Sequence, residues 1–179
     1  DFFIKEGEIV GLAGKSGAGK STLIKCIYRT CIPSKGEIIY NSKKFGKIDL
    51  AKADDYEILA LRKSEMTYCS QFLSVIPRVT AIDVVAVSLV SKGESWENAR
   101  QIAKEYLSKL GLDEELWDAY PSTFSGGEQQ RINVARAIIS KPHFLLIDEP
   151  TASLDQKTKD IVINMVLDLK NQGTSVLCI

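Results

Sequence analysis

Histidine is almost absent from this sequence of 179 residues, which contains a single one, His143. The four cysteines form no C-x-x-C pair; they are Cys26, Cys31, Cys69 and Cys178. With so few nitrogen ligands and no paired thiols, a zinc site is not expected. Unpaired cysteines in apolar runs are typical of small core residues in a reducing compartment, so we expect at least three of the four to be buried.

The sequence also lacks an excess of charge, since 23 Lys and Arg residues balance 23 Asp and Glu residues. Nucleic acids and anionic membrane surfaces attract basic proteins, so neither is an expected partner. No apolar run approaches the roughly 20 residues of a membrane-spanning helix, because Asp83 interrupts the longest candidate, residues 81–90. No signal peptide is visible either. These absences favour a cytoplasmic protein that is not inserted in a membrane and that depends on another subunit for any membrane-spanning part.

The two ends of the sequence indicate a longer native chain. Asp1 stands where an initiator methionine is expected, and residues 175–179 form an apolar run typical of a strand. A domain rarely stops inside a strand, so we expect the sequence to be a fragment. Its length suits one domain rather than several.

Short apolar runs alternate with amphipathic segments along most of the sequence. The apolar runs predict strands at residues 7–13, 37–40, 66–69, 144–147 and 175–179. Helices are predicted at residues 20–29, 56–63, 126–139 and 157–170. Polar residues 41–49 are expected to form a hairpin or a loop. This alternation predicts an α/β fold with a mainly parallel sheet that is covered on both faces.

Strand signals disappear between residues 81 and 117, where the apolar spacing is helical instead. The residues that follow the i, i+3, i+4, i+7 spacing are Ala99, Ile102, Ala103, Tyr106, Leu107 and Leu110. We therefore expect a single domain over residues 1–179 that contains a separate helical lobe. Residues 1–72 and 133–179 would form the α/β core, and residues 73–132 would form the inserted helical subdomain.

Residues 14–21 match the pattern G-x-x-x-x-G-K-[ST] between a predicted strand and a predicted helix, the setting that a phosphate-binding loop requires. Glycines let the backbone N–H groups point at phosphate oxygens, and the start of the helix adds its positive end. We expect Lys20 to reach the β- and γ-phosphates of ATP and the Ser21 hydroxyl to ligate Mg²⁺. A merely flexible glycine-rich turn is the alternative. The residues expected to contact the nucleotide are Gly14, Lys15, Ser16, Gly17, Ala18, Gly19, Lys20, Ser21 and Thr22.

Asp148 and Glu149 directly follow the apolar run at residues 144–147. The carboxyl ends of parallel strands form the edge of the sheet at which ligands bind. Asp148 is positioned to hold Mg²⁺ through water, and Glu149 to polarise the water that attacks the γ-phosphate. Alone, such a pair fits an ordinary solvated strand end, but the phosphate loop upstream favours the catalytic interpretation.

Residues 125–131, with the sequence SGGEQQR, open a predicted helix, and with the two motifs above they resemble the signature of ABC ATPases. A serine hydroxyl and glycine N–H groups at a helix start can bind an anion. Ser125 is also expected to be the N-cap of this helix, but an N-cap alone leaves the paired glycines unexplained. The resemblance implies a P-loop NTPase with a RecA-like core, an antiparallel β edge and an inserted α-helical subdomain. It also implies a second ABC ATPase domain, identical or related, whose bound ATP is contacted by Ser125, Gly126, Gly127 and Glu128.

Two further positions correspond to motifs of this family. Gln71 corresponds to a loop glutamine that senses Mg²⁺ and the γ-phosphate. Asp155 ends the Ser-Leu-Asp sequence at residues 153–155 and corresponds to a loop that crosses the dimer interface. The family's adenine-stacking aromatic residue and switch histidine are expected before and after the present sequence. His143 cannot replace that histidine because it precedes Asp148.

Two segments resemble a narrower family, the L subunit of the phosphonate carbon–phosphorus lyase system. They are residues 70–79, SQFLSVIPRV, and residues 116–125, LWDAYPSTFS. This resemblance implies an ATPase that acts with the lyase complex in alkylphosphonate metabolism, with lyase subunits as its partners. Apolar residues 72–76 and 81–90 are candidates for a docking surface, while burial of residues 81–90 in a core helix is the alternative.

Other functions stay open at this point. An exporter ATPase that resembles the lipoprotein-release or macrolide systems would have a membrane permease as its partner and lie against the inner membrane. An ATP-dependent structural clamp would close on the nucleotide with negligible turnover. A DNA-associated ABC ATPase is disfavoured, since that class generally carries a long coiled-coil or zinc insertion for which residues 72–124 are too short.

Overall fold

The computed structural model describes residues 2–179. Its strands are β1 (Ile9–Gly11), β2 (Ile39–Ser42), β3 (Gly46–Asp49), β4 (Met66–Cys69), β5 (Phe144–Ile147) and β6 (Ser175–Cys178). Its helices are α1 (Lys20–Ile27), α2 (Asp55–Ser64), α3 (Ala81–Val90), α4 (Trp96–Lys109), α5 (Gly126–Ile138) and α6 (Gln156–Asn171), with two 3-10 helices, η1 (Glu114–Leu116) and η2 (Pro121–Thr123). The predicted strands and helices are confirmed in order and type, with small shifts at their ends.

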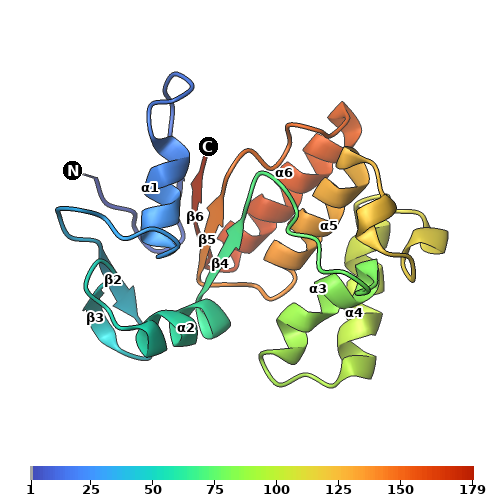
Figure 1. The fold of residues 1–179 in the computed structure, drawn as a ribbon, viewed down its shortest axis with the longest axis horizontal. Coiled ribbons are helices and arrows are strands. Elements are labelled where there is room, and N and C mark those ends of the chain that lie inside the picture. The colour runs from blue at the N-terminus through green and yellow to red at the C-terminus, as the bar shows by residue number, and fades with distance from the viewer. Residues whose placement is uncertain (1) are drawn as a thin grey trace.

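Four parallel strands form the central sheet in the order β1-β6-β5-β4 (Figure 1). β6 lies between β1 and β5, so that Leu177 stands opposite Val10 on one side and opposite Leu146 on the other. β2 and β3 form a separate antiparallel hairpin in which Tyr40 stands opposite Ile48. The mainly parallel sheet is thus confirmed, and the antiparallel part is this hairpin.

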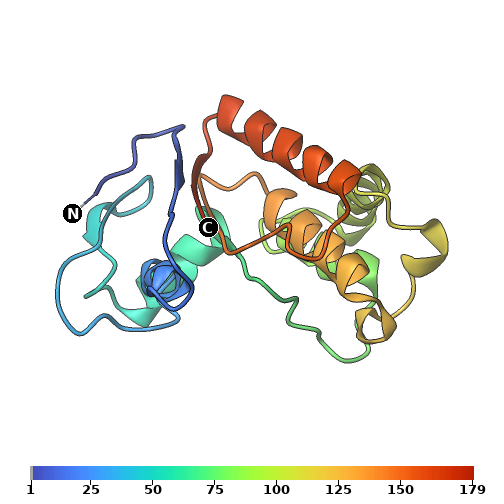
Figure 2. The ribbon, with the colours of Figure 1, turned by 90° about the horizontal axis from the view of Figure 1, so that it is seen from above.

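Each face of the sheet has its own hydrophobic core, because successive strand residues point to opposite faces. Leu145, Ile147 and Val176 face the core that the sheet shares with α3, α4, α5 and α6. Leu146 and Leu177 face the core shared with α1, α2 and the hairpin. Figure 2 shows α6 in red and α1 in blue on opposite sides of the strands. Coverage of both faces, which the strand–helix alternation predicts, is therefore confirmed.

α3 and α4 pack against each other and against α5, beside the sheet (Figure 1). Ala99, Ala103 and Leu107 are buried on one face of α4, as their spacing predicts. At the surface between α3 and α4, the Arg100 guanidinium donates to both carboxylate oxygens of Asp83, at 2.7 and 3.0 Å. No helix within residues 2–179 has the length and apolar character needed to span a membrane.

The boundaries of the helical subdomain at residues 73 and 132 stay predictions. The first boundary falls in the loop between β4 and α3. The second falls inside α5, which runs without a break from Gly126 to Ile138. One continuous helix therefore contacts both the sheet and the α3–α4 pair.

α3 is a core helix, so the docking interpretation of residues 81–90 is wrong and its alternative is confirmed. The buried residues of α3 are Ala81, Ile82, Val84, Val85 and Ala86. By contrast, Phe72 and Ile76 in the loop before α3 are 74% and 52% exposed. The exposed apolar side chains of the two segments are thus those of Phe72 and Ile76 in the loop and of Val87 on α3, which is 43% exposed.

Burial of the cysteines is less complete than the sequence predicts. Cys69 is buried in β4, Cys26 and Cys178 are half-buried, and Cys31 is exposed. An apolar run predicts burial only for the face that it turns to the core. Cys178 packs against the core but is only partly covered, and Cys31 lies in the loop after α1.

Glu65 follows α2 and is a buried carboxylate that is only 3% exposed. It accepts hydrogen bonds from the hydroxyls of Tyr40 and Ser42, at 3.0 and 2.8 Å, and from the N–H groups of Lys43 and Lys44, at 3.1 and 3.2 Å. Burial alone would raise the pKa of Glu65, but these donors together lower it. The ionised carboxylate therefore holds the β2–β3 hairpin against the end of α2.

Acid should weaken this attachment. Because the pKa of Glu65 is lower in the folded than in the unfolded protein, its charge stabilises the fold above the unfolded pKa of 4.5, and this contribution is lost as the pH falls through the folded pKa. We expect Glu65→Gln to lower the free energy of unfolding at neutral pH by about 1–3 kcal/mol. The same variant should lose less stability than the wild type in acid. Urea unfolding at neutral and acidic pH measures both effects, with Glu105→Gln on the exposed side of α4 as the control. Equal stability of Glu65→Gln and the wild type at neutral pH would contradict this role.

Candidate functional site

The loops that follow β1, β4 and β5 meet at the carboxyl edge of the sheet (Figure 1). The first loop contains the phosphate-loop motif and leads into α1. Gln71 lies in the second loop, and Asp148 and Glu149 begin the third. The structure thus brings the three predicted parts of the nucleotide site to the edge at which parallel sheets bind ligands.

The phosphate loop wraps tightly before α1. Gly17 and Gly19 have φ angles of 79° and 87°, which are left-handed conformations that glycine adopts without strain. The Lys20 ammonium donates to the carbonyl oxygens of Gly14 and Lys15, at 2.9 and 3.1 Å. The first N–H groups of α1 have no partner within the helix, so that they and the ammonium form an end suited to phosphate. The remaining predicted residues, Ser16, Ala18 and Thr22, are exposed.

Ser21 and Asp148 are 127 residues apart in the sequence, and their side chains are in contact. The Ser21 hydroxyl donates to Oδ1 of Asp148 at 2.9 Å, and the Tyr68 hydroxyl donates to Oδ2 at 3.1 Å. Asp148 is only 4% exposed. Burial, followed by the charge and hydrogen bond of Asp148, raises the pKa of Tyr68, so its hydroxyl remains a donor. Sequence reasoning missed Tyr68, because an aromatic residue in a strand gives no signal beyond packing.

The Ser21–Asp148 pair has the chemistry that Mg²⁺ requires. Mg²⁺ prefers oxygen ligands and is commonly held by one or two carboxylates together with substrate phosphates. Among residues 2–179, no three His, Cys, Asp or Glu side chains gather closely enough to hold a metal ion by themselves. A magnesium ion at Ser21 and Asp148 would therefore take further oxygens from a bound nucleotide and from water.

Gln71 and Glu149 face each other across the mouth of this site. The Gln71 amide donates to Oε2 of Glu149 at 3.4 Å, and both side chains are exposed. Glu149 has a φ angle of 49°, a left-handed conformation that costs a residue other than glycine about 1–3 kcal/mol. The chain turns at this strained residue instead of continuing in the direction of β5, and the Glu149 carboxylate lies beside Gln71.

Two buried amides of α5 hold the loops of this edge in place. Gln130 donates to the carbonyl oxygen of Pro150 at 2.8 Å, and Asn133 donates to that of Ser70 at 2.5 Å. They are 4% and 0% exposed. α5 is thereby tied to the loops after β4 and β5. Sequence reasoning missed both residues, although two amides three positions apart among the apolar residues of a predicted helix were the available signal.

Ser125 caps the start of α5, and Glu128 completes a capping box with it. The N–H and the hydroxyl of Ser125 donate to the same Glu128 oxygen, at 2.7 and 2.8 Å. Gly126 and Gly127 form the first turn, where a Cβ on Gly127 would lie 3.1 Å from the carbonyl oxygen of Ser153. The N-cap interpretation is therefore confirmed. Contact of these residues with a partner's ATP stays a prediction.

Asp155 caps the start of α6. It accepts hydrogen bonds from the N–H and the hydroxyl of Thr158, at 2.9 and 2.7 Å, and pairs with Arg131 at 3.2 Å. Hydrogen bonds from Thr158 and then from Arg131 lower the pKa of Asp155 to about 2. Asp155 thus joins α6 to α5 within one chain, and its place at a dimer interface stays a prediction.

The start of α5 and the phosphate loop lie apart in the structure. In both views the blue loop before α1 is on the left of the molecule and the yellow-orange first turn of α5 is on the right (Figures 1 and 2). The two predicted phosphate contacts of one chain are therefore not neighbours.

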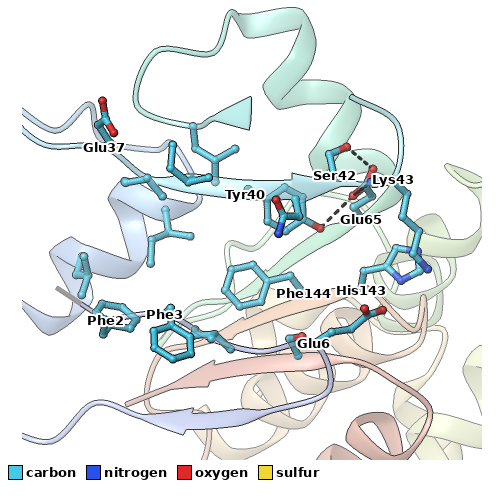
Figure 3. Close-up of a pocket in the computed structure, with 18 of the residues that line it drawn as sticks. Phe2, Phe3, Glu6, Glu37, Tyr40, Ser42, Lys43, Glu65, His143 and Phe144 are labelled. Atoms are coloured by element: carbon cyan, nitrogen blue, oxygen red, sulfur yellow. Dashed lines mark hydrogen bonds between the residues drawn. The ribbon is translucent and has the colours of Figure 1, made fainter. Parts of the chain in front are cut away.

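A cavity of about 980 Å³ lies away from the phosphate loop, between the N-terminal segment, β2 and the start of β5 (Figure 3). None of the predicted site residues lines it, whereas Phe3, Tyr40, His143 and Phe144 do. His143 is an exposed residue of the loop before β5. Partial burial of its ring, followed by the charge of Lys43, lowers the pKa of His143. This cavity is separate from the candidate site.

Comparison with known proteins points to one family. The family model described as ABC transporter matches residues 1–152. The lipoprotein-releasing system ATP-binding protein LolD of Zymomonas mobilis is 36% identical over 178 residues, which are 99% of this chain and 74% of LolD. The histidine/lysine/arginine/ornithine transport ATP-binding protein HisP of Escherichia coli is 33% identical over 178 residues, 97% of this chain and 69% of HisP. The L-cystine import ATP-binding protein TcyC of Bacillus subtilis is 35% identical over 183 residues, with coverages of 100% and 71%.

Solved structures agree with these relatives. The dimeric structure of a post-hydrolysis state of the ATP-binding cassette MJ0796, bound to ADP and Pi, superposes with a TM-score of 0.89 at 33% identity. The match covers 99% of this chain and 76% of that chain. The P-loop α/β fold with its phosphate loop, acidic pair and SGGEQQR helix is that of an ATPase, and the chain belongs to the ABC transporter family as its ATP-binding and ATP-hydrolysing domain.

Proposed function

We propose that Lys20, Ser21, Gln71, Asp148 and Glu149 bind Mg²⁺-ATP and hydrolyse its γ-phosphate. This proposal rests on one observation: the five side chains lie at one edge of the sheet, where Ser21 is hydrogen-bonded to Asp148 and Gln71 is hydrogen-bonded to Glu149. Gly14 to Gly19 and Thr22 supply backbone N–H groups around the phosphates.

Each side chain has a separate part in this proposal. Lys20 exchanges its two loop carbonyls for the β- and γ-phosphate oxygens. Ser21 and Asp148 would hold Mg²⁺, which would neutralise charge on the phosphates. Glu149 accepts a proton from the water that attacks the γ-phosphorus, and ADP leaves as the bond between the β- and γ-phosphates breaks. Gln71 donates to Glu149 and thereby orients its carboxylate.

We further propose that the site is completed by a second ABC ATPase domain, in a homodimer or a heterodimer. Ser125, Gly126, Gly127 and Glu128 of one domain would contact the ATP held by the other, and Asp155 would lie at the interface. The separation of the phosphate loop from the start of α5 within one chain supports this arrangement. The dimeric state of MJ0796, a protein of the same fold, supports it as well.

For the cellular role, we propose the ATPase subunit of an exporter of the lipoprotein-release type. Its permease partner would lie in the inner membrane, with this subunit on the cytoplasmic side. LolD is the ATP-binding protein of a lipoprotein-releasing system, and HisP and TcyC are ATP-binding proteins of amino-acid transport and import. The exposed loop with Phe72 and Ile76, at the start of the proposed helical subdomain 73–132, is the candidate contact for the permease.

A second candidate is an ATPase subunit of the phosphonate carbon–phosphorus lyase complex. The resemblance of residues 70–79 and 116–125 to its L subunit favours it, whereas none of the relatives named above belongs to that system. Affinity purification of the complete protein from detergent-treated cells separates the two candidates. Recovery of an integral membrane permease is expected for the exporter, and recovery of lyase subunits without a permease would contradict it.

Removal of the Glu149 carboxylate should abolish turnover without abolishing binding. We expect Glu149→Gln in the complete protein to lower ATP hydrolysis about 10²–10⁴-fold, because the general base is lost while the phosphate contacts remain. Phosphate release and equilibrium nucleotide binding measure the two properties. Glu105→Gln, which lies on α4 away from the site, is the control. Unchanged turnover in Glu149→Gln would rule out the proposed base.

Mixed dimers of the complete protein test the shared site. One protomer that carries both Lys20→Ala and Gly127→Asp should inactivate both sites of a dimer, even beside a wild-type protomer. Separating the same two substitutions onto different protomers should leave one intact site and about half of the activity. Differentially tagged protomers allow each dimer to be purified and assayed. If each chain held its own complete site, the two dimers would show the opposite pattern.

A further inference from the structure

Tyr68 lies on β4, next to the strand that delivers Asp148. Parallel pairing sets Tyr68 opposite Leu146, two residues before Asp148 on β5. The Tyr68 hydroxyl donates to Oδ2 of Asp148 at 3.1 Å, while Oδ1 accepts from Ser21 at 2.9 Å. Each carboxylate oxygen of Asp148 therefore has its own side-chain donor.

The Tyr68 ring is itself held in place on its far side. Its centroid lies 5.4 Å from that of Tyr28 at an angle of 46°. The Arg62 guanidinium covers the Tyr28 ring at 4.4 Å and donates twice to the Tyr28 carbonyl oxygen, at 2.7 and 3.0 Å. These contacts fix the direction in which the Tyr68 hydroxyl points.

A metal ion at Ser21 needs the Asp148 carboxylate in one orientation. While the Ser21 proton is donated to Asp148, the lone pairs of the Ser21 oxygen are left to face the ion. Because Asp148 is 4% exposed, water cannot readily replace a lost donor at Oδ2. Without the Tyr68 hydroxyl, the carboxylate is free to rotate about its last bond, and the Ser21 hydroxyl loses its fixed acceptor.

We propose that Tyr68 is a positioning residue for the magnesium site, acting through the Asp148 carboxylate. The inference rests on the proposed roles of Ser21 and Asp148. Donors behind a metal ligand orient it, and their loss typically weakens metal binding or activity about 10–100-fold. Tyr68 makes no contact with nucleotide in this role, so its hydroxyl affects the metal and leaves metal-free nucleotide binding alone.

The chain offers a matched control in Tyr40. Its hydroxyl also donates to a buried carboxylate, that of Glu65 at 3.0 Å, but in the hairpin and away from the phosphate loop. Tyr40→Phe and Tyr68→Phe therefore delete the same group from the same kind of contact. Only the Tyr68 hydroxyl bonds to a proposed metal ligand.

Mn²⁺ titration followed by electron paramagnetic resonance tests the inference on the complete protein with a non-hydrolysable ATP analogue. Tyr68→Phe should bind Mn²⁺ about 10-fold more weakly or worse, with unchanged affinity for the analogue in EDTA. It should also need about 10-fold more Mg²⁺ for half-maximal hydrolysis. Tyr40→Phe should match the wild type in all three measurements. 4-Aminophenylalanine at position 68, which keeps the ring and a donor, should restore Mn²⁺ binding.

Three results would overturn the inference. Tyr68→Phe could bind Mn²⁺ as the wild type does, it could lose metal-free nucleotide binding to the same extent, or Tyr40→Phe could weaken Mn²⁺ binding equally. Failure of the wild type itself to bind Mn²⁺ with the analogue would overturn the proposed magnesium site together with the inference. Thermal unfolding of each variant shows whether Tyr68→Phe is folded. If it is not, the protein with 4-aminophenylalanine at position 68 provides the test. Failure of that protein, when folded, to bind Mn²⁺ would also count against the inference.

Discussion

The hydrogen bond between Ser21 and Asp148 joins the first turn of α1 to the loop after β5, and the proposed nucleotide site depends on it. β1 and β5 both pair with β6, so that the loops after them leave the sheet from positions separated by one strand. A shift of one residue in either pairing would turn the strand side chains to the wrong core. The two hydrophobic cores therefore fix the register of the strands, and the register fixes the distance between the phosphate loop and the acidic pair.

α5 extends this control beyond the sheet. It begins with the SGGEQQR segment, and its buried amides Gln130 and Asn133 donate hydrogen bonds to the loops that follow β5 and β4. Its apolar residues meanwhile pack against α3, α4 and the sheet. A displacement of this helix would therefore move the loops after β4 and β5. A second domain that contacts the start of α5 would in this way affect the candidate site.

The residues of the candidate site were easier to predict from the sequence than the residues that hold them in place. The phosphate loop, the acidic pair and the order of strands and helices follow from glycine spacing, apolar runs and periodicity, because these patterns arise from local geometry. Tyr68 gave no such signal, and the two amides Gln130 and Asn133 signalled burial without naming their partners, since those partners come from other elements and only the assembled fold brings them together. The exposure of Cys31 and the burial of α3 were likewise set by which face each segment turns to the core.

A structure of the complete protein with ATP and Mg²⁺ bound is the decisive measurement. We expect each nucleotide to lie between the phosphate loop of one domain and the Ser125–Gly127 turn of the other, with the ion at Ser21 and Asp148. A well-ordered ATP-loaded assembly in which the start of α5 faces solvent, with no phosphate opposite it, would show that the site is not shared between two domains.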